Sequence, residues 1–256
     1  MLRIGILASG NGTITEKIVQ NCEYNPILRG HAKVVGVIAS SCFAPILENE
    51  LIQGRLGYFY CTSVDSEDST GDPRAFGEDI LSVFQAWGVN FVVQDGWLCK
   101  TPQNVIDAFD GGKRMINAHP GPLDPGRADV GGKGMFGRRV HAAWLHYLRE
   151  TGASPWWTEC TTQFVASEYD EGSVISTKLY DLAWYEKHKE HTLEAAAHLL
   201  NDMLLQYEQA LMVETLIDFV LDRVTVRTRV HPLISQDTIP ILEQGKNLAK
   251  KMFPHG

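Results

Sequence analysis

The 256-residue chain lacks an excess of positive charge. It carries 23 Lys and Arg against 31 Asp and Glu, a formal net charge of −8 at pH 7 with His neutral. Nucleic acids and anionic membranes bind proteins through positive faces that neutralise phosphate. The charge balance therefore disfavours both, and we expect small-molecule substrates with neither nucleic acid nor membrane as a partner.

Paired cysteines and long apolar runs are also missing. The five Cys residues stand far apart, with an odd total and no Cys-x-x-Cys pair, so a disulfide framework and a zinc ribbon both fit badly. No stretch approaches the roughly 18 to 20 apolar residues that span a bilayer. The apolar run near the N-terminus is too short for the core of a signal peptide and leads into a glycine turn. These absences predict a cytoplasmic protein without a bound metal.

Apolar, β-branched runs alternate with segments of helical periodicity as far as residue 116. Strands are expected at residues 4–8, 33–39, 58–61, 91–94 and 114–118, with helices after 13 and at 45–56, 73–87 and 102–109. This alternation is typical of an α/β fold with an open, mostly parallel, Rossmann-like sheet and helices on both faces.

The second half of the chain is expected to begin with an irregular, glycine-rich loop at 119–137. A loop of this length inside a compact domain is usually functional or disordered. Beyond it the pattern predicts helices at 140–150 and 192–219, strands at 158–165 and 174–182, then a short β-like stretch at 224–230 and a polar tail. We expect one domain over residues 1–220 and a short C-terminal extension over 221–256.

The ends of the predicted strands are the places to look for a site, because ligands in such sheets bind beyond the carboxyl ends of the strands. Gly10, Asn11, Gly12 and Thr13 lie between the first strand and a helix. Backbone N–H groups and the helix dipole meet there, which suits a phosphate or a carboxylate. A tight turn that needs glycine conformations explains the same residues equally well.

Asn117 and His119 lie two positions apart at the end of another predicted strand, so their side chains leave the sheet on the same side. An amide and an imidazole directed at one point suit acyl transfer, in which one group holds a developing oxyanion and the other moves a proton. Asp170 follows a later strand and is a candidate carboxylate partner for His119. A turn contact at 117–119 and a surface hairpin at 169–172 are the alternatives.

Several stretches together resemble the folate-dependent formyltransferase family: residues 6–13, 116–120, 132–137, 140–141 and 169–175. The likeness covers about residues 1–220, which would be the catalytic domain. It is greatest to the branch that transfers the formyl group of 10-formyltetrahydrofolate to the amine of 5-phosphoribosylglycinamide in purine biosynthesis.

The resemblance implies roles for the candidate residues. Asn117 and His119 would stabilise the tetrahedral intermediate that forms when the amine attacks the formyl carbon. Asp170 would keep the imidazole charged and help to shuttle the proton. The substrate phosphate and ribose would be bound by Gly10, Asn11, Gly12, Thr13, Arg74 and Glu208, and the folate by Trp97, Leu98, Cys99, Lys100, Ala166, Ser167, Glu168 and Tyr169.

The chain departs from the family at Ile14, at Gly121-Pro122 and at Gln163, where the family usually has Asn, Ser-Leu and His. These departures leave open another amine, such as an amino-sugar nucleotide, and a non-catalytic folate or nucleotide binder. Only six Lys or Arg fall in 221–256, too few for a tRNA-binding domain. A formyltetrahydrofolate hydrolase is disfavoured because it would carry a further domain ahead of the first strand. A homodimer is a possible assembly.

Overall fold

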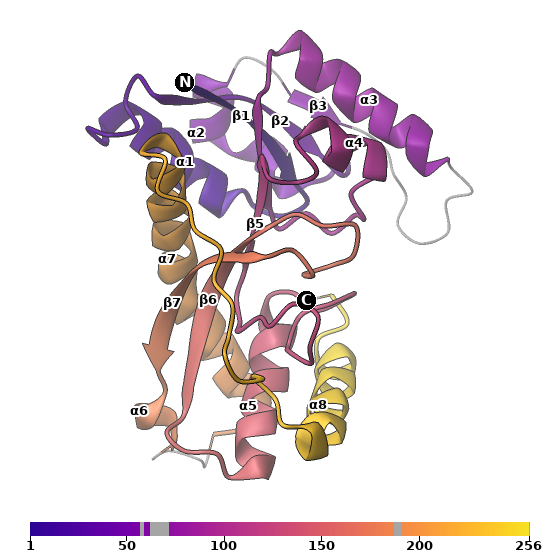
Figure 1. Ribbon diagram of the computed structural model, residues 1–256, viewed down its shortest axis with the longest axis vertical. Helices are drawn as coiled ribbons and strands as arrows, with labels where there is room; N and C mark the ends of the chain where they lie inside the picture. Colours follow the sequence, from indigo (N-terminus) through magenta and orange to yellow (C-terminus); the bar gives the residue numbers. More distant parts are fainter. Residues whose placement is uncertain (57–58, 62–71, 187–190, 256) are drawn as a thin grey trace. The chain divides into compact units, whose positions relative to one another are not determined.

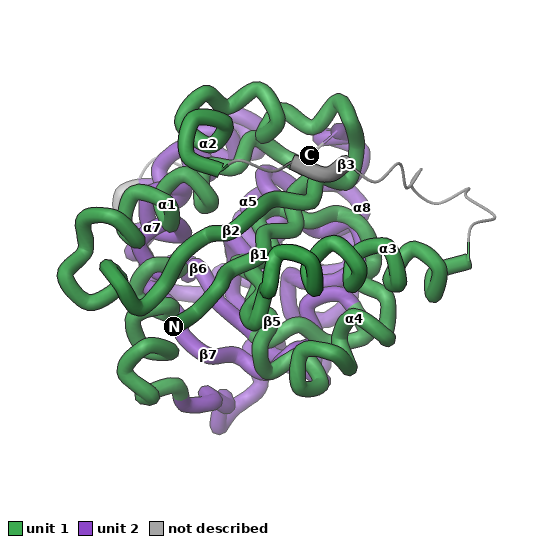
Figure 2. Tube along the Cα trace, turned by 90° about the horizontal axis from the view of Figure 1, so that it is seen from above, with its two compact units in different colours: residues 1–118, 164–168, 212–224 green, residues 119–163, 169–211, 225–256 purple. Residues whose placement is uncertain are grey.

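The computed structural model describes residues 1–56, 59–61, 72–186 and 191–255. The chain forms two compact units, which Figure 2 distinguishes by colour. The first unit comprises Met1–Ala118, Phe164–Glu168 and Met212–Val224, and the second comprises His119–Gln163, Tyr169–Leu211 and Thr225–Gly256. This division differs from the predicted single boundary near residue 220, because 221–224 belong to the first unit and 225–256 to the second.

The first unit is built on a parallel sheet with the strand order β3-β2-β1-β4-β5. Its strands are β1 (Leu2–Ala8), β2 (Ala32–Ala39), β3 (Phe59–Cys61), β4 (Phe91–Asp95) and β5 (Met115–His119). Ile6 of β1 lies between Val37 and Val93 of the neighbouring strands. A central strand is covered on both faces, which explains its unbroken apolar run. The predicted open, mostly parallel sheet is confirmed, although position 58 of the third predicted strand lies outside the described residues.

Helices cover this sheet in two pairs. They are α1 (Thr13–Tyr24), the 3-10 turn η1 (Pro45–Glu48), α2 (Glu50–Arg55), α3 (Pro73–Ala86) and α4 (Gln103–Ala108). Helix α1 packs against α2 and α3 packs against α4, and Figure 2 shows these pairs on opposite sides of the strands. The helix predicted at 45–56 is interrupted at Asn49, because its side chain accepts the Ile52 N–H at 3.2 Å and starts a new helix there.

The second unit contains an antiparallel strand pair and several helices, labelled in Figure 1. These elements are β6 (Trp157–Phe164), β7 (Val174–Asp181), α5 (Arg138–Thr151), α6 (Ala183–Glu186), the 3-10 turn η2 (Gln236–Thr238) and α8 (Ile239–Met252). Helix α7 (Leu193–Val220) belongs to this unit as far as Leu211, and Phe164 of β6 belongs to the first unit. Among the residues described, no helix has both the length and the apolar character needed to cross a membrane.

The prediction of a polar tail without regular structure was wrong, because helix α8 forms there. The predicted β-like stretch at 224–230 forms only a single bridge, between Arg227 and Val174. Leu242, Gly245 and Ala249 recur at helical spacing on α8 and are buried. The contact with α5 is close, since a Cβ at Gly245 would lie 3.0 Å from the Ala143 carbonyl oxygen. The amphipathic pattern of α8 is present in the sequence, and its Lys-rich outer face masks it.

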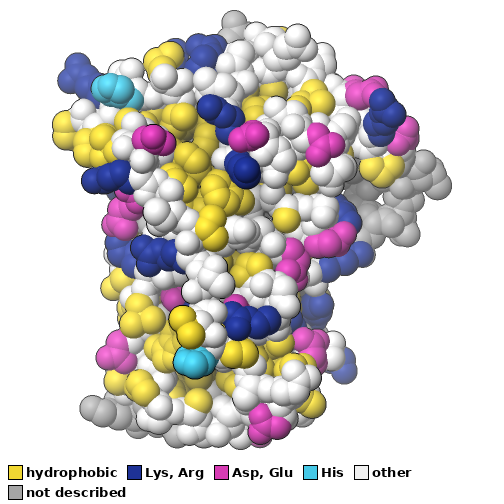
Figure 3. Space-filling model, viewed as in Figure 1, with side chains coloured by type: hydrophobic (Ala, Val, Ile, Leu, Met, Phe, Trp, Pro, Cys, Tyr) yellow, Lys and Arg dark blue, Asp and Glu magenta, His cyan; other side chains and the backbone are white. Residues whose placement is uncertain are grey.

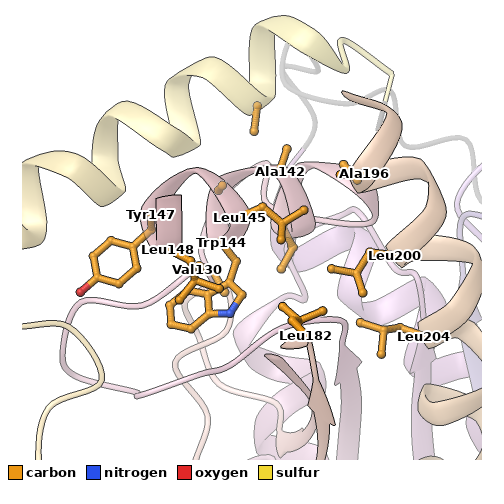
Figure 4. Packing of buried hydrophobic residues seen from close by; sticks show 14 of the residues in the cluster. Val130, Ala142, Trp144, Leu145, Tyr147, Leu148, Leu182, Ala196, Leu200 and Leu204 are labelled. Atoms are coloured by element: carbon orange, nitrogen blue, oxygen red, sulfur yellow. The ribbon is translucent and has the colours of Figure 1, made fainter. Parts of the chain in front are cut away.

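Helix α5 contributes its apolar face to the core of the second unit. Figure 4 shows Trp144, Leu145 and Leu148 of α5 near Leu200 and Leu204 of α7, all of them buried. This packing fixes α5 immediately after the glycine-rich loop, and so holds the C-terminal end of that loop in place.

Candidate active site

His119 and Asp170 come together in the second unit, as the sequence predicts. His119 is the last residue of β5, and Asp170 lies in the loop between β6 and β7. The imidazole Nδ1 is 3.6 Å from the carboxylate Oδ1, and the two side chains are 3% and 11% exposed. That distance is longer than a hydrogen bond, and it is an ion-pair distance when the imidazole is protonated.

Two hydrogen bonds hold the Asp170 carboxylate in place. Gln163 Nε2 donates to Oδ1 at 2.9 Å, and the Gly132 N–H donates to Oδ2 at 2.9 Å. The Asp170 backbone has a φ of 60°, a left-handed conformation that Asp tolerates better than most residues. Gln163, which the sequence marks only as a departure from the family pattern, is therefore one of the two residues that orient Asp170.

The glycine-rich loop is shaped to fit around Asp170. A Cβ at Gly131 would lie 2.7 Å from the Asp170 Cβ and 2.7 Å from Leu123 Cδ2, so only glycine fits. Asp129 fixes the loop, because its carboxylate accepts the N–H groups of Asp124 and Gly131, both at 2.7 Å. Burial raises the pKa of Asp129, and these N–H groups and the charge of His119 oppose the rise. The loop is thus an ordered part of the site.

The other ring nitrogen of His119 is unpaired in the part of the chain that the structure describes. Nε2 is buried and has no hydrogen-bond partner among the residues that the structure describes. His141 of α5 is 1% exposed, and burial together with the nearby charge of His119 lowers the pKa of His141 to about 3. His141 is therefore neutral at pH 7.

Asn117 lies two residues before His119 on β5 and pairs with Gln94 of β4 in the parallel register. It is half-buried, and no side-chain hydrogen bond joins it to another residue in the described ranges. On a strand, residues two apart point to the same face. The amide is thus free to donate to a ligand.

The predicted phosphate loop leads into α1, and a carboxylate already occupies the helix end. Gly12 has a left-handed φ of 73°, and a Cβ there would lie 2.5 Å from Ile46 Cγ1, so the turn requires glycine. Asp95, at the end of β4, accepts the Thr15 N–H at 2.8 Å and the Thr15 hydroxyl at 2.7 Å. Burial raises the pKa of Asp95, while its bonds from Thr15 and from the Ile14 backbone oppose the rise.

Other residues predicted to bind the substrate are placed as follows. Gly10 accepts the Ile46 N–H at 3.0 Å through its carbonyl, and Asn11 is exposed. The Arg74 guanidinium on α3 pairs with Glu78 and makes no bond to the phosphate loop within the described residues. Glu208 lies on α7 in the second unit, where burial, and after it the charge of Glu208, raises the pKa of Cys160. The structure gives no sign that Arg74 and the loop act together.

The two predicted folate segments of the first unit do come together. Lys100 Nζ lies 2.7 Å from Glu168 Oε1, which joins residues 97–100 to residues 166–168. The Leu98 N–H donates to Ser9 Oγ at 3.0 Å, so the folate segment also meets the start of the phosphate loop. These contacts place two predicted binding segments at one edge of the sheet.

The surroundings of this edge suit a flat organic ring. Trp97 is buried and stacks on Phe76 with 6.3 Å between ring centroids, while Leu98 is 47% exposed. The Trp97 indole N–H is buried and unpartnered among the described residues. Cys99 and Ala166 are half-buried, Ser167 is exposed, and Tyr169 begins the Asp170 loop in the second unit. This edge therefore presents an apolar wall, and the Trp97 N–H is buried within it.

Asp95, Asp129 and His141 are residues that the sequence analysis missed. Each is a polar residue within an apolar or glycine-rich stretch, which was the available signal. The residues that act on Asp95 and His141 are distant in sequence, whereas Asp129 bonds to Asp124 and Gly131 of its own loop. No group of three or more His, Cys, Asp or Glu in the described part of the chain is arranged to hold a metal ion.

The fold is that of the formyltransferases. Glycinamide ribonucleotide transformylase 1 of Symbiobacterium toebii has a TM-score of 0.66 and 24% identity, covering 90% of this chain and 92% of that one. The corresponding protein of Geobacillus kaustophilus has a TM-score of 0.62 and 20% identity over 86% of this chain and 99% of that one. A formyltetrahydrofolate deformylase of Pseudomonas syringae shares the fold at 0.58 and 13% identity, over 89% of this chain and 64% of that one.

In sequence, the chain is similar to the chloroplastic phosphoribosylglycinamide formyltransferase of Arabidopsis thaliana. The two are 33% identical over 124 residues, which make up 45% of this chain and 38% of that protein. The match therefore spans well under half of that relative. No model of a known protein family matches the chain.

Proposed function

We propose that the protein transfers a formyl group from 10-formyltetrahydrofolate to the amine of 5-phosphoribosylglycinamide, a step of de novo purine biosynthesis. The observation that carries the proposal is the buried His119–Asp170 pair, with Asp170 fixed by two hydrogen bonds and His119 Nε2 left for a ligand. The similarity to enzymes named for this activity supports the choice of reaction.

Each residue of the cluster has a role that its contacts support. His119, charged beside Asp170, donates from Nε2 to the oxygen of the formyl group as that oxygen gains negative charge. The free amide of Asn117 is a second donor for the same oxygen. Donors that are fixed before the reaction need no reorganisation when the charge develops. Asp170 takes part in moving the proton that the attacking amine loses to N10 of the folate, whose bond to the formyl carbon breaks as tetrahydrofolate leaves.

The folate co-substrate, which carries the formyl group, would lie against residues 97–100 and 166–169. Trp97 and Leu98 would hold the pterin, and the Lys100–Glu168 ion pair would keep the two segments together. The phosphate of the amine substrate would meet the 10–13 loop. These assignments, with Arg74 near the phosphate and Glu208 at the ribose, are proposals from the resemblance.

A second amine substrate is favoured by one observation. The Asp95 carboxylate accepts N–H groups of the first turn of α1, and the Ile14 side chain in that turn is apolar. A phosphate would otherwise meet free N–H groups there. Two anions at one helix end repel each other. An amine whose phosphate is farther from its amino group, as in an amino-sugar nucleotide, is the alternative. The compartment of the reaction, which we propose to be the cytoplasm, and assembly as a homodimer are parts of the same proposal.

The test is a substrate screen with 10-formyltetrahydrofolate held constant and release of tetrahydrofolate followed spectroscopically. Turnover with 5-phosphoribosylglycinamide is expected, and turnover only with an amino-sugar nucleotide would move the assignment to the second amine. His119→Ala should abolish turnover and leave folate affinity within about threefold. Exposed His231 supplies the matched control, His231→Ala, which should keep full activity. Release of formate without an amine acceptor would instead indicate a hydrolase.

A further inference from the structure

The second unit contains a cavity of about 490 Å³ that is lined by none of the predicted catalytic, substrate or folate residues. Its walls come from residues 123–127, from the start of β7 and from residues 226–229. The segment between α7 and α8, which supplies residues 226–229, runs along the face of the molecule shown in Figure 1. In Figure 3 the same face carries Lys and Arg side chains together with acidic and hydrophobic ones.

The cavity is basic in a protein that is acidic overall. Arg127, Arg227 and Arg229 line it, together with a single carboxylate, Asp124, although the chain as a whole has a net charge of −8. Arg127 Nη2 donates to Asp124 Oδ1 at 2.7 Å and to the Arg229 carbonyl oxygen at 2.8 Å. A guanidinium has five N–H donors in a rigid plane. These two bonds fix its position and leave further donors for a ligand.

The remaining two arginines differ in how their charge is balanced. Arg229 donates to the Leu123 carbonyl at 3.0 Å and pairs with Glu159, which is buried. Arg227 is exposed, and its guanidinium has no acceptor among the described residues. Its backbone is held in place, because the Arg227 N–H donates to the Val174 carbonyl at 2.8 Å. The cavity therefore presents, on a fixed backbone, a guanidinium that no acceptor within the described residues holds by a hydrogen bond, and its charge also acts on Glu159.

The rest of the lining is apolar or carries hydroxyl groups. These residues are Leu123, Pro125, Val174, Val226, Ser173, Thr177 and Thr228. A cavity of a few hundred Å³ with apolar walls and a few convergent polar groups is typical of small-molecule sites. Guanidinium groups match the planar geometry of carboxylate and phosphate oxygens.

We propose that this cavity binds a small organic anion, whose carboxylate or phosphate group pairs with Arg227 and with the spare donors of Arg127 and Arg229. The apolar part of the ligand lies against Val174 and Val226. The proposal is independent of the formyl transfer, because it uses no residue of the catalytic cluster and requires neither folate nor an amine.

Titration calorimetry on the full chain tests the proposal, with ribose 5-phosphate as the phosphate probe, glutarate as the carboxylate probe and ribose as the uncharged control. At least one anion should bind saturably, and ribose should not. Arg227→Ala should weaken that binding about 10-fold or more, as expected for loss of a charged hydrogen-bonding group. Arg227→Lys should recover only part of it, since an ammonium lacks the planar fork. The probe whose affinity falls more in Arg227→Ala shows whether the cavity prefers a phosphate or a carboxylate.

Arg223 supplies the matched control, because it is an exposed arginine of the same stretch that is already paired with Asp218 at 3.0 Å and lies outside the cavity. Arg223→Ala should change the affinity less than twofold. Binding of ribose 5-phosphate at the 10–13 loop would not change in Arg227→Ala. Only the binding that this substitution weakens is therefore assigned to the cavity. Absence of saturable binding, or equal losses in Arg227→Ala and Arg223→Ala, would overturn the proposal and leave the proposed formyl transfer unaffected.

Discussion

Replacing Asp170 by asparagine should separate the catalytic role of this carboxylate from its structural one. Both of its oxygens face donors, Oδ2 the Gly132 N–H and Oδ1 the Gln163 amide and His119 Nδ1. An asparagine has one acceptor oxygen and an NH2 group. With its oxygen on Gly132, its NH2 group faces Gln163, whose buried Oε1 has no partner among the described residues and can turn to accept. The structural bonds are thereby restored.

His119 is the residue that Asp170→Asn leaves unsatisfied, because an NH2 group cannot accept from Nδ1 or balance an imidazolium. Two unit charges 3.6 Å apart interact by about 5 kcal/mol at an effective dielectric constant of about 20. The asparagine dipole retains part of this interaction. We expect a loss of about 2.7 kcal/mol or more in the transition state, so kcat should fall at least about 100-fold.

The assay combines steady-state kinetics, thermal melting and nitrogen NMR of the His119 ring. In Asp170→Asn the melting temperature should change little, KM should stay within about threefold, and the ring-nitrogen signals of His119 should show loss of the imidazolium form. Glu171→Gln is the matched control, since Glu171 is the adjacent carboxylate and accepts instead from the Gly126 N–H at 2.8 Å. An effect on KM alone, or equal losses of kcat in the two variants, would refute the assigned role.

Three further predictions follow from buried groups. Because burial lowers the pKa of His141 from 6.5 to about 3, the unfolded chain takes up a proton that the folded one does not. The free energy of unfolding should therefore fall by about 2 kcal/mol from pH 7 to pH 5. Urea titrations should show that His141→Gln removes this dependence and that His231→Gln does not. The affinity for phosphate should fall as pH rises, because Asp95 becomes charged. In calorimetry, Asp95→Asn should strengthen phosphate binding and make it less dependent on pH. Unchanged binding in this variant would exclude a phosphate near Asp95. Leu242→Ala should destabilise the protein by about 2 to 5 kcal/mol in the same urea titrations, and a similar loss in the more exposed Leu248→Ala would contradict the packing of α8.

The parallel sheet and most helices could be predicted from the chain because their signals are local. The β-branched run of β2 and the Pro73 start of α3 each have a short-range physical cause. The same holds for the His119 end of β5, where Pro120 stops further sheet pairing. Helix α8 was missed because polar side chains outnumber the few residues that it buries.

The sequence by itself determined the residue types of the candidate site, namely an amide and an imidazole two apart on a strand, a carboxylate after a later strand and a glycine turn before a helix. Only the tertiary structure decided which distant groups complete them. Gln163 fixes Asp170, Asp129 ties down the glycine-rich loop, and Asp95 occupies the start of α1. The Gln163–Asp170 and Thr15–Asp95 contacts join different elements, and the Asp129 contact forms only when its loop is folded. Burial raises the pKa of Asp95 and Asp129, and local spacing encodes neither the contacts nor the burial.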